Sequence, residues 1–432
     1  MAYTTGTLSY LAGGPVEGAW KLWEYTTTDL VSAVVASGYV SDATAKGMSV
    51  GDFVLMINQA NPQGYILQVQ SMTAASGNTP GTATLAVPAG VGGPNLANFR
   101  NPVDGGDFTT NPWQRGTSFT SIASTLTYTA DRRFAIGGAS SSISVLQATG
   151  ITAVPGFNQA LQFGRANGNT NTAVISLGQV LESADSVRCQ GQTVTLSFWA
   201  AAGANWSPAS GNLNALLASS TGTNQSAASL VAGTWTGYSS LTLAPQQGSA
   251  AAVANIAQPI TSTWTRYSFT ATVPAGCSQL GLVFSATPTG TAGSADYVQI
   301  MGVQLEIGAQ ATPFEHRDVQ VELEIAQRYC WVIPEPAAGV VIAQGGANAA
   351  ANAQTYLLYT PVQMRTAPTV TVATGGFRVA AAAAAATATI TAGGTHTPNQ
   401  ITLTSAVTET VGLSANIQGG GGAGSIMVSA DF

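Results

Sequence analysis

Short runs of alternating apolar and polar residues, separated by Gly, Pro and Asn, recur through the middle of this chain. In "TVTLSFWA" the residues Val194, Leu196 and Phe198 fall on alternate positions, which places them on one face of a β-strand. The runs "WTRYSFTATV" and "GVQLEIG" show the same alternation. Strands of this kind at a spacing of about 8 to 12 residues are typical of β-sandwiches. The pattern predicts two sheets that bury these apolar sets between them.

The composition also favours β-structure. Only 7% of the residues are charged, and 49 of the 432 are glycine. A surface with so few charges must consist largely of Ser, Thr, Asn, Gln and backbone, which suits Thr-rich strands and Gly-rich turns. The chain is longer than one core usually supports, so we expect several domains.

We divide the chain into three domains, a linker and a connector. Residues 1–90 contain a helix-like stretch, "TTTDLVSAVVASGY", followed by strand-like runs, and predict a small mixed α/β domain. The Gly-, Pro- and Asn-rich residues 91–102 are a linker. Residues 103–317 form the sandwich, 318–332 a connector, and 333–432 a C-terminal β-rich domain. The overall fold class is therefore predicted to be mainly β.

A run of seven alanines, Ala380–Ala386, interrupts the C-terminal domain. Alanine favours helix by intrinsic propensity, but the residues on both sides are Thr-rich and β-branched. We expect the run to be strand.

The charge pattern and the cysteines exclude several classes of protein. The net charge is −6, and the 13 basic residues form no cluster, so we expect no nucleic-acid partner. The sequence shows no standard export signal and no 18-residue apolar run, so we expect no membrane insertion. Cys189, Cys277 and Cys330 show no CxxC spacing and are expected to be buried free thiols.

The sequence carries no recognisable reaction chemistry. It has two histidines, His316 and His396, and no nucleotide, metalloprotease or serine-hydrolase motif. The acidic residues show no spacing that would pair two of them across a glycosidic bond, and we expect Glu306 to face solvent. We therefore predict a protein that is not an enzyme and uses no cofactor.

The stretch "FEHRDVQVELEIAQRYCWV" (314–332) gathers six charged side chains in 19 residues. Its apolar residues fit two structures: a half-buried strand through alternate positions, or a short helix with Val321, Ile325 and Tyr329 on one face. In either case an apolar seam beside charges could fix the register between chains of an oligomer. The simpler alternative is a solvent-exposed bend between two domains, whose charges only prevent aggregation. The proposed seam residues are Val319, Val321, Leu323, Ile325 and Tyr329.

Several segments, in their order along the chain, resemble bacteriophage fibre and other virion structural proteins. They are "DGGDFTTNPWQRGTSF", "TYTADRRF", "ADYVQIMGVQLEIGAQATPFEHRDVQVELEIAQRYCWV" and "PVQMRTAPTVTV". The resemblance implies a jelly-roll module similar to carbohydrate-binding modules, a connector and a β-rich tip. One departure is Ala326, where the family usually has cysteine.

The resemblance also implies function and partners. The chain would be a homotrimeric fibre or spike on the virion surface that mediates adsorption to host-surface glycans. Residues 1–90 look similar to leading domains of phage head fibres, which implies attachment to other virion proteins. The alternatives are a capsid-decorating head-fibre protein with a purely structural role, and a glycan-degrading tailspike. Modules of this kind often hold calcium, which would make Asp107 with Asp296 or Glu306 a metal site.

Four aromatic residues are candidates for glycan binding. Trp199 falls on the opposite face of its strand from the predicted core residues. Trp206, Trp235 and Tyr238 lie in Gly-, Ser- and Asn-rich segments. An exposed ring beside amide side chains suits stacking on a sugar. The alternative is that these residues are core or trimer contacts, because tryptophan is mostly buried. We assign the other five tryptophans to packing: Trp20, Trp23, Trp113, Trp264 and Trp331.

Overall fold

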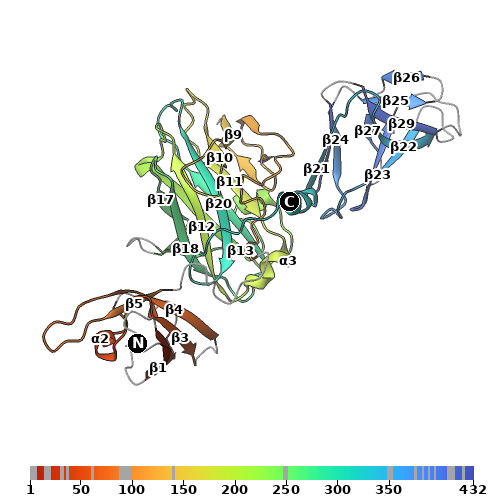
Figure 1. The fold of residues 1–432 in the computed structure, drawn as a ribbon. Helices are drawn as coiled ribbons and strands as arrows, with labels where there is room; N and C mark the ends of the chain where they lie inside the picture. Colours follow the sequence, from red (N-terminus) through yellow and green to blue (C-terminus); the bar gives the residue numbers. More distant parts are fainter. Residues whose placement is uncertain are drawn as a thin grey trace. The chain divides into compact units, whose positions relative to one another are not determined.

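The computed structural model confirms that the chain is mainly β (Figure 1). None of the helices in the described part of the chain has the length and apolar character that crossing a membrane requires. The structure describes residues 7–13, 21–29, 34–35, 38–59, 63–86, 100–138, 142–246, 252–347, 354–373, 377–381, 384–387, 390–393, 396–405, 414–420 and 424–432. Most of the predicted N-terminal helix and of the 91–102 linker lies outside these ranges.

The chain divides into two compact units. The first contains residues 1–100 and 306–315, and the second contains residues 101–305 and 316–432. The predicted sandwich, connector and C-terminal domain thus fall mainly within the second unit.

The first unit is built on a five-stranded sheet with the strands in sequence order. Strands β2 and β3 are parallel, and the other neighbours are antiparallel. Trp23, Tyr25, Met56 and Leu67 are buried in its core. The elements are β1 (Leu8–Gly13), β2 (Lys21–Thr27), α2 (Ala43–Lys46), β3 (Phe53–Asn58), β4 (Gln63–Met72) and β5 (Ala83–Ala86).

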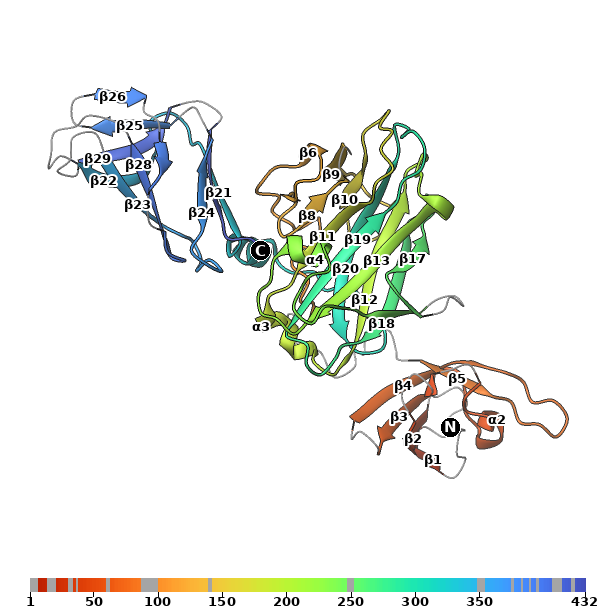
Figure 2. The same ribbon diagram turned by 180° about the vertical axis from the view of Figure 1, so that it is seen from behind.

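Two sheets face each other in the second unit and form the predicted sandwich (Figure 2). Phe198 of β12 (Thr193–Ala202) and Phe284 of β19 (Gln279–Ala286) meet edge to face in its core, with ring centroids 4.8 Å apart. The eight-stranded sheet has the order β16 (Val253–Ala254), β15 (Thr242–Pro245), β18 (Thr265–Thr272), β12 (Thr193–Ala202), β20 (Tyr297–Ile307), β10 (Gln159–Arg165), β9 (Ile143–Thr149) and β6 (Ser118–Ile122). The seven-stranded sheet has the order β14 (Ser239–Ser240), β13 (Asn212–Ser220), β19 (Gln279–Ala286), β11 (Ile175–Val180), β8 (Phe134–Ile136) and β7 (Thr127–Tyr128), with β17 (Ile256–Pro259) paired to β13.

Short helical segments connect these strands. They are α3 (Ser183–Ser186), η2 (Val187–Cys189), η3 (Ala209–Gly211) and α4 (Ala227–Val231). The side chain of Ser226 caps α4 by accepting a hydrogen bond from the backbone of Ser229, as serine commonly does at a helix start.

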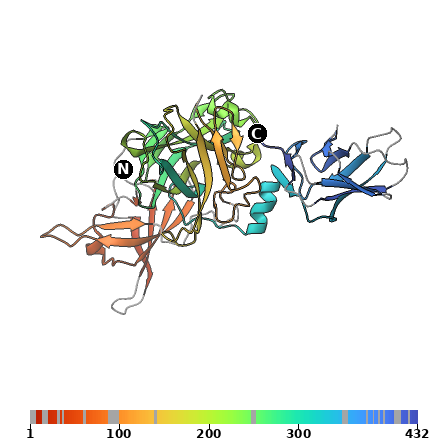
Figure 3. The ribbon, with the colours of Figure 1, turned by 90° about the horizontal axis from the view of Figure 1, so that it is seen from above.

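The connector begins with a helix, α5 (Val319–Gln327) (Figure 3). Asp318 caps it by accepting a hydrogen bond from the backbone N–H of Gln320. Of the two structures that fit this stretch, the helix is therefore correct and the strand is wrong.

The C-terminal part contains a three-stranded and a seven-stranded sheet, with Tyr356, Ile401, Ile417 and Val428 among its buried residues. In the alanine run, Ala380 and Ala381 belong to β25 and Ala384–Ala386 to β26, which confirms the strand prediction for these residues; positions 382 and 383 lie outside the described residues. The smaller sheet has the order β21 (Cys330–Pro334), β30 (Ser425–Ser429) and β24 (Thr369–Val372). The larger has the order β26 (Ala384–Thr387), β25 (Phe377–Ala381), β29 (Ser414–Gly419), β22 (Val341–Ala347), β23 (Gln354–Tyr359), β28 (Gln400–Ser405) and β27 (Ile390–Ala392).

Candidate functional site

Trp199 lies on the face of the eight-stranded sheet that points away from the sandwich core. Its neighbour Phe198 points inward to Phe284, and adjacent residues of a strand point to opposite faces. The cross-strand partner of Trp199 is Arg266 of β18, whose guanidinium donates a hydrogen bond of 3.0 Å to the hydroxyl of Ser197. Trp199 and Arg266 are both partly exposed, so a ring and a cation lie side by side at the surface.

A glycine lets aromatic rings lie directly on strand β20. Gly302 has a φ of +60°, and a Cβ there would come within 2.8 Å of the Phe157 ring and 3.3 Å of the Trp199 ring. Only glycine takes this backbone conformation without strain. The ring of Phe157 is in turn 5.0 Å from that of His316, whose Nδ1 is 2.7 Å from a carboxylate oxygen of Asp107.

Two amide side chains occupy the same face on neighbouring strands. Gln162 of β10 and Gln299 of β20 are cross-strand partners, and the amide of Gln299 donates to that of Gln162 over 3.1 Å. They point away from the core because the adjacent Leu161 and Ile300 are fully buried. We call Trp199, Arg266, Ser197, Gln162 and Gln299 together the β12 face.

The other three predicted aromatic residues lie elsewhere. Trp206 is partly exposed in the loop after β12, and its indole N–H donates to the carbonyl of Gly211 over 3.0 Å. Trp235 is only 3% exposed and donates to the carbonyl of Ser226 over 2.9 Å. Trp235 is thus a core residue, which corrects the expectation of an exposed ring. Tyr238 packs against the same cluster as Trp235.

The loop that carries Trp206 is held by a buried arginine. Arg165 pairs with Asp296 over 2.7 Å, with side-chain exposures of 0% and 1%. Asp296 also accepts hydrogen bonds from the backbone and side chain of Ser207. The Arg165 guanidinium therefore joins three loops at one end of the sandwich. Its remaining acceptors are Asn169, Asn171, Ser207, Thr289 and Gly290.

The residues proposed for calcium are each bound to a different partner. Asp107 is bound to His316, and Asp296 is bound to Arg165. Glu306 is 3% exposed and accepts two hydrogen bonds from Thr312, so the expectation that it faces solvent is wrong. In the part of the chain that the structure describes, no three His, Cys, Asp or Glu residues are grouped as metal ligands. The arrangement does not support the suggested calcium site.

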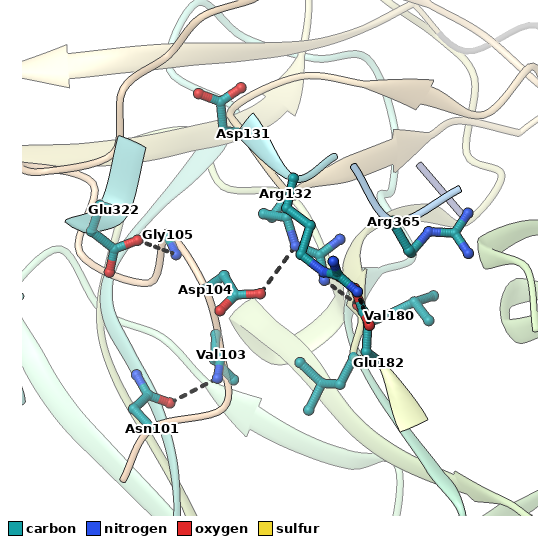
Figure 4. Close-up of polar contacts among 12 residues, drawn as sticks. Asn101, Val103, Asp104, Gly105, Asp131, Arg132, Val180, Glu182, Glu322 and Arg365 are labelled. Atoms are coloured by element: carbon teal, nitrogen blue, oxygen red, sulfur yellow. Dashed lines mark hydrogen bonds and ion pairs between the residues drawn. The ribbon is translucent and has the colours of Figure 1, made fainter. Parts of the chain in front are cut away.

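The sandwich and the connector meet around a buried arginine (Figure 4). Arg132, in the turn between β7 and β8, donates to Asp104 over 3.1 Å and to the carbonyl of Val180 over 2.8 Å. Its guanidinium carbon lies 3.4 Å from the centre of the Tyr329 ring, a close cation–π contact. Tyr329 is 2% exposed. The Tyr329 ring is buried against Arg132 of its own chain. Its assignment to a seam between chains is therefore wrong.

Three of the charges in the 314–332 stretch fasten the connector to the sandwich. Arg328 makes two hydrogen bonds to Glu182, of 2.7 and 3.0 Å. Glu322 of α5 accepts from the backbone of Gly105 over 3.0 Å and lies 3.4 Å from Arg317. Paired charges at a buried contact specify one arrangement because a mispaired one is costly. These contacts account for three of the six charged residues in the stretch.

The buried face of α5 is not the apolar one. Glu322 and Ala326 are buried, whereas Val319 is 58% exposed. Val321, Leu323 and Ile325 are partly exposed on the flanks of the helix. These four remain available as contacts for another chain.

The three cysteines are free and buried, as predicted. Burial raises the pKa of Cys189 to about 11 and that of Cys330 to about 12. Both thiols are therefore protonated at neutral pH and poor nucleophiles.

Asp131 gives the junction a pH dependence. Burial raises the pKa of this carboxyl to about 6, although the backbone of Gln114 and the charge of Arg115 oppose the shift. A carboxyl with a raised folded-state pKa stabilises the fold at low pH, and this contribution is lost as the pH rises from about 4 to 6. From pH 4 to pH 6, the free energy of unfolding of the wild type should fall relative to that of Asp131→Asn by at most about 3 kcal/mol. Urea unfolding of both proteins at both pH values measures this. An equal change in the free energy of unfolding of the two proteins would contradict the prediction.

Comparisons with known proteins give fold likenesses only. No protein-family model and no curated protein matches the chain. Among solved structures, it is similar to the enzymatically active domain of tailspike protein 4 of bacteriophage CBA120, at 14% identity and a TM-score of 0.27, over 49% of this chain and 22% of that one. A protein from Bacteroides thetaiotaomicron named as a candidate sugar-binding protein matches at 12% identity and a TM-score of 0.27, over 48% of this chain and 100% of that one.

A third likeness is to the K1 cleaved adhesin domain of Lys-gingipain from Porphyromonas gingivalis, at 15% identity and a TM-score of 0.22, over 45% of this chain and 100% of that one. Likenesses this weak assign no function to the chain.

Proposed function

We propose that this chain is a structural protein of a bacteriophage particle, a fibre or spike that binds host-surface glycans without cleaving them. The observation that carries the glycan proposal is the β12 face, where a partly exposed tryptophan lies beside an arginine, and two paired amides occupy the same face of the sheet. The sequence segments that resemble virion fibre proteins, and that follow one another in the same order, support the proposal that the chain is part of the virion.

The chemistry of the β12 face suits a pyranose ring. The face of an indole stacks on the C–H face of a sugar, and the amides of Gln162 and Gln299 can both donate to and accept from its hydroxyls. Arg266 supplies donors only, so it would favour an acidic or hydroxyl-rich glycan. The side chains project from neighbouring strands of one sheet, so no loop has to become ordered on binding.

Replacing Trp199 with alanine tests the proposal. We expect Trp199→Ala to weaken glycan binding at least about tenfold, because the stacking surface is lost. Binding is measured on a glycan array and by titration with the best ligand. Tyr359→Ala is the matched control, because Tyr359 is an exposed aromatic residue, at 74%, in the C-terminal part. Unchanged binding by a folded Trp199→Ala protein would rule out the β12 face, and loss of binding in Trp206→Ala alone would assign the loop instead.

We further propose that three chains associate through α5. The supporting observation is the partly exposed apolar set Val319, Val321, Leu323 and Ile325. Three weak glycan sites on one fibre would raise avidity without a strong individual contact.

Sedimentation equilibrium should give three times the mass of one chain for the wild type. Val319→Asp combined with Leu323→Asp should give single chains, since both positions lie on one flank of the helix. Gln320→Asp, an exposed position on the same helix, should remain trimeric. A wild-type protein that sediments as a single chain at micromolar concentration would refute the association.

A further inference from the structure

A hollow lies on the eight-stranded sheet at one end of β18, on the face that points away from the sandwich core. Its volume is about 430 Å³, within the range of pockets that bind small ligands. None of the residues that line it in the described part of the chain is charged, and most are threonine or serine. We call it the threonine hollow. Its hydroxyl residues are Thr193, Ser239, Ser240, Thr242, Thr270 and Thr272.

The strand pairing places the threonine hollow on the same side of the sheet as the β12 face. Trp199 of β12 and Arg266 of β18 are cross-strand partners, and such partners point to one face of a sheet. Alternate residues of a strand also share a face. Thr193 therefore lies on the face of Trp199, and Thr270 lies on that of Arg266. Ala244 of β15 lies there too, because it pairs with Thr270.

Hydroxyl side chains lie between the β12 face and the threonine hollow. Thr270 is four residues from Arg266, or roughly 13 Å along the strand at about 3.3 Å per residue. One sugar ring does not span this distance, but an oligosaccharide does. The intervening side chains are buried, so such a ligand would pass over them and contact the two ends. They are Ser197, Ser268 and Thr195.

The lining of the hollow favours a neutral sugar over a charged or a peptide ligand. A threonine hydroxyl both donates and accepts hydrogen bonds, as a sugar hydroxyl does. The Thr270 hydroxyl donates to the carbonyl of Ala244 over 3.4 Å, and its oxygen can still accept. A charged ligand would meet no opposite charge among the lining residues. A peptide strand would need unpaired backbone groups, but β15 and β18 pair with each other here.

We propose that the ligand of the β12 face is a linear oligosaccharide, with one ring stacked on Trp199 and a neutral sugar further along the chain bound in the threonine hollow. This inference rests on the glycan binding proposed for the β12 face. A single hydrogen bond to a hydroxyl contributes little net binding energy, so several hydroxyls of the hollow act together. The affinity should therefore depend on the length of the oligosaccharide.

Calorimetric titration with oligosaccharides of defined length tests this inference. The probes are disaccharides, tetrasaccharides and hexasaccharides from partial hydrolysis of the host-surface polysaccharide that retains the wild type. The wild type should bind the hexasaccharide at least about tenfold more tightly than the disaccharide. Thr242→Val combined with Thr270→Val keeps the β-branched shape and removes two hydroxyls. This variant should lose at least about fivefold in hexasaccharide affinity and bind the disaccharide as the wild type does.

A matched control and Trp199→Ala separate the possible results. Thr369→Val combined with Thr371→Val changes two exposed threonines of β24 and should keep the wild-type preference for the hexasaccharide. Equal affinity of the wild type for all lengths would overturn this inference alone, if Trp199→Ala still weakens binding. Undiminished hexasaccharide affinity in the hollow variant would do the same. Unchanged binding of every probe by Trp199→Ala, or no binding of any probe by the wild type, would overturn the proposed glycan site as well.

Discussion

Replacing Arg132 with methionine should lower the free energy of unfolding of the second unit by about 3–5 kcal/mol. Arg132 is 2% exposed and hydrogen-bonds to Asp104 and to the carbonyl of Val180. Methionine fills a similar space but leaves Asp104 without its closest cation, and it leaves the Val180 carbonyl without this donor. It also removes the cation from the face of the Tyr329 ring. Urea unfolding followed by tryptophan fluorescence measures the change.

Two further variants separate charge from packing at this junction. Arg132→Lys keeps the charge but loses the planar guanidinium that stacks on Tyr329, so it should also be destabilised, though less than Arg132→Met. Arg188→Met, which removes an exposed arginine, should change the stability by less than about 0.5 kcal/mol. Equal stability of Arg132→Met and Arg188→Met would show that the junction contributes little.

Arg165→Met should be comparably damaging, at about 3–5 kcal/mol, and its effect should concentrate at one end of the sandwich. The substitution leaves Asp296 buried without its cation, and it releases the carbonyls of two loops and the Ser207 hydroxyl of the third. Amide hydrogen exchange should therefore quicken in residues 166–172, 203–208 and 287–296 more than in β12.

A double-mutant cycle isolates the ion pair from the rest of the network. Asp296→Asn removes the carboxylate, so the double variant should lose less stability than the two single variants together. Strict additivity would mean that the Arg165–Asp296 contact is not the source of the effect.

The alternation of apolar residues predicted the sheets well because the two faces of a strand have a strict period of two. It placed Phe198 in the core and Trp199 on the opposite face, and both placements are correct. The same reasoning was ambiguous at 319–325, where apolar residues fit both a strand and a helix. The buried carboxylate of Glu322 decides the helix face, and no hydrophobic pattern could have identified it.

Local composition was a weak guide to the exposure of single aromatic residues. Trp235 lies in a Gly- and Ser-rich segment, yet residues of α4 and of the seven-stranded sheet bury its ring. Burial there depends on tertiary contacts distant in sequence. The contributions of Arg165, Arg266 and Gly302 were likewise missed, because their partners lie on other strands.

The scarce charges were also hard to place from the sequence. In a chain with only 7% charged residues, these residues would be expected at the surface. Arg132, Arg133 and Arg165 are nevertheless all buried. The adjacent charges of "TADRRF", with no other charged residue between Arg115 and Arg165, are a signal that could have indicated the burial of Arg132 and Arg133.

The most direct test of the account is to incubate the wild-type chain with purified host-surface polysaccharide, and to measure both retention of the protein and release of reducing ends. We predict that the protein is retained and that no reducing ends appear above the level of a protein-free sample. Sustained release of reducing ends would identify a glycan-degrading tailspike, and absence of retention on any host polysaccharide would favour a purely structural protein; either result would contradict the account.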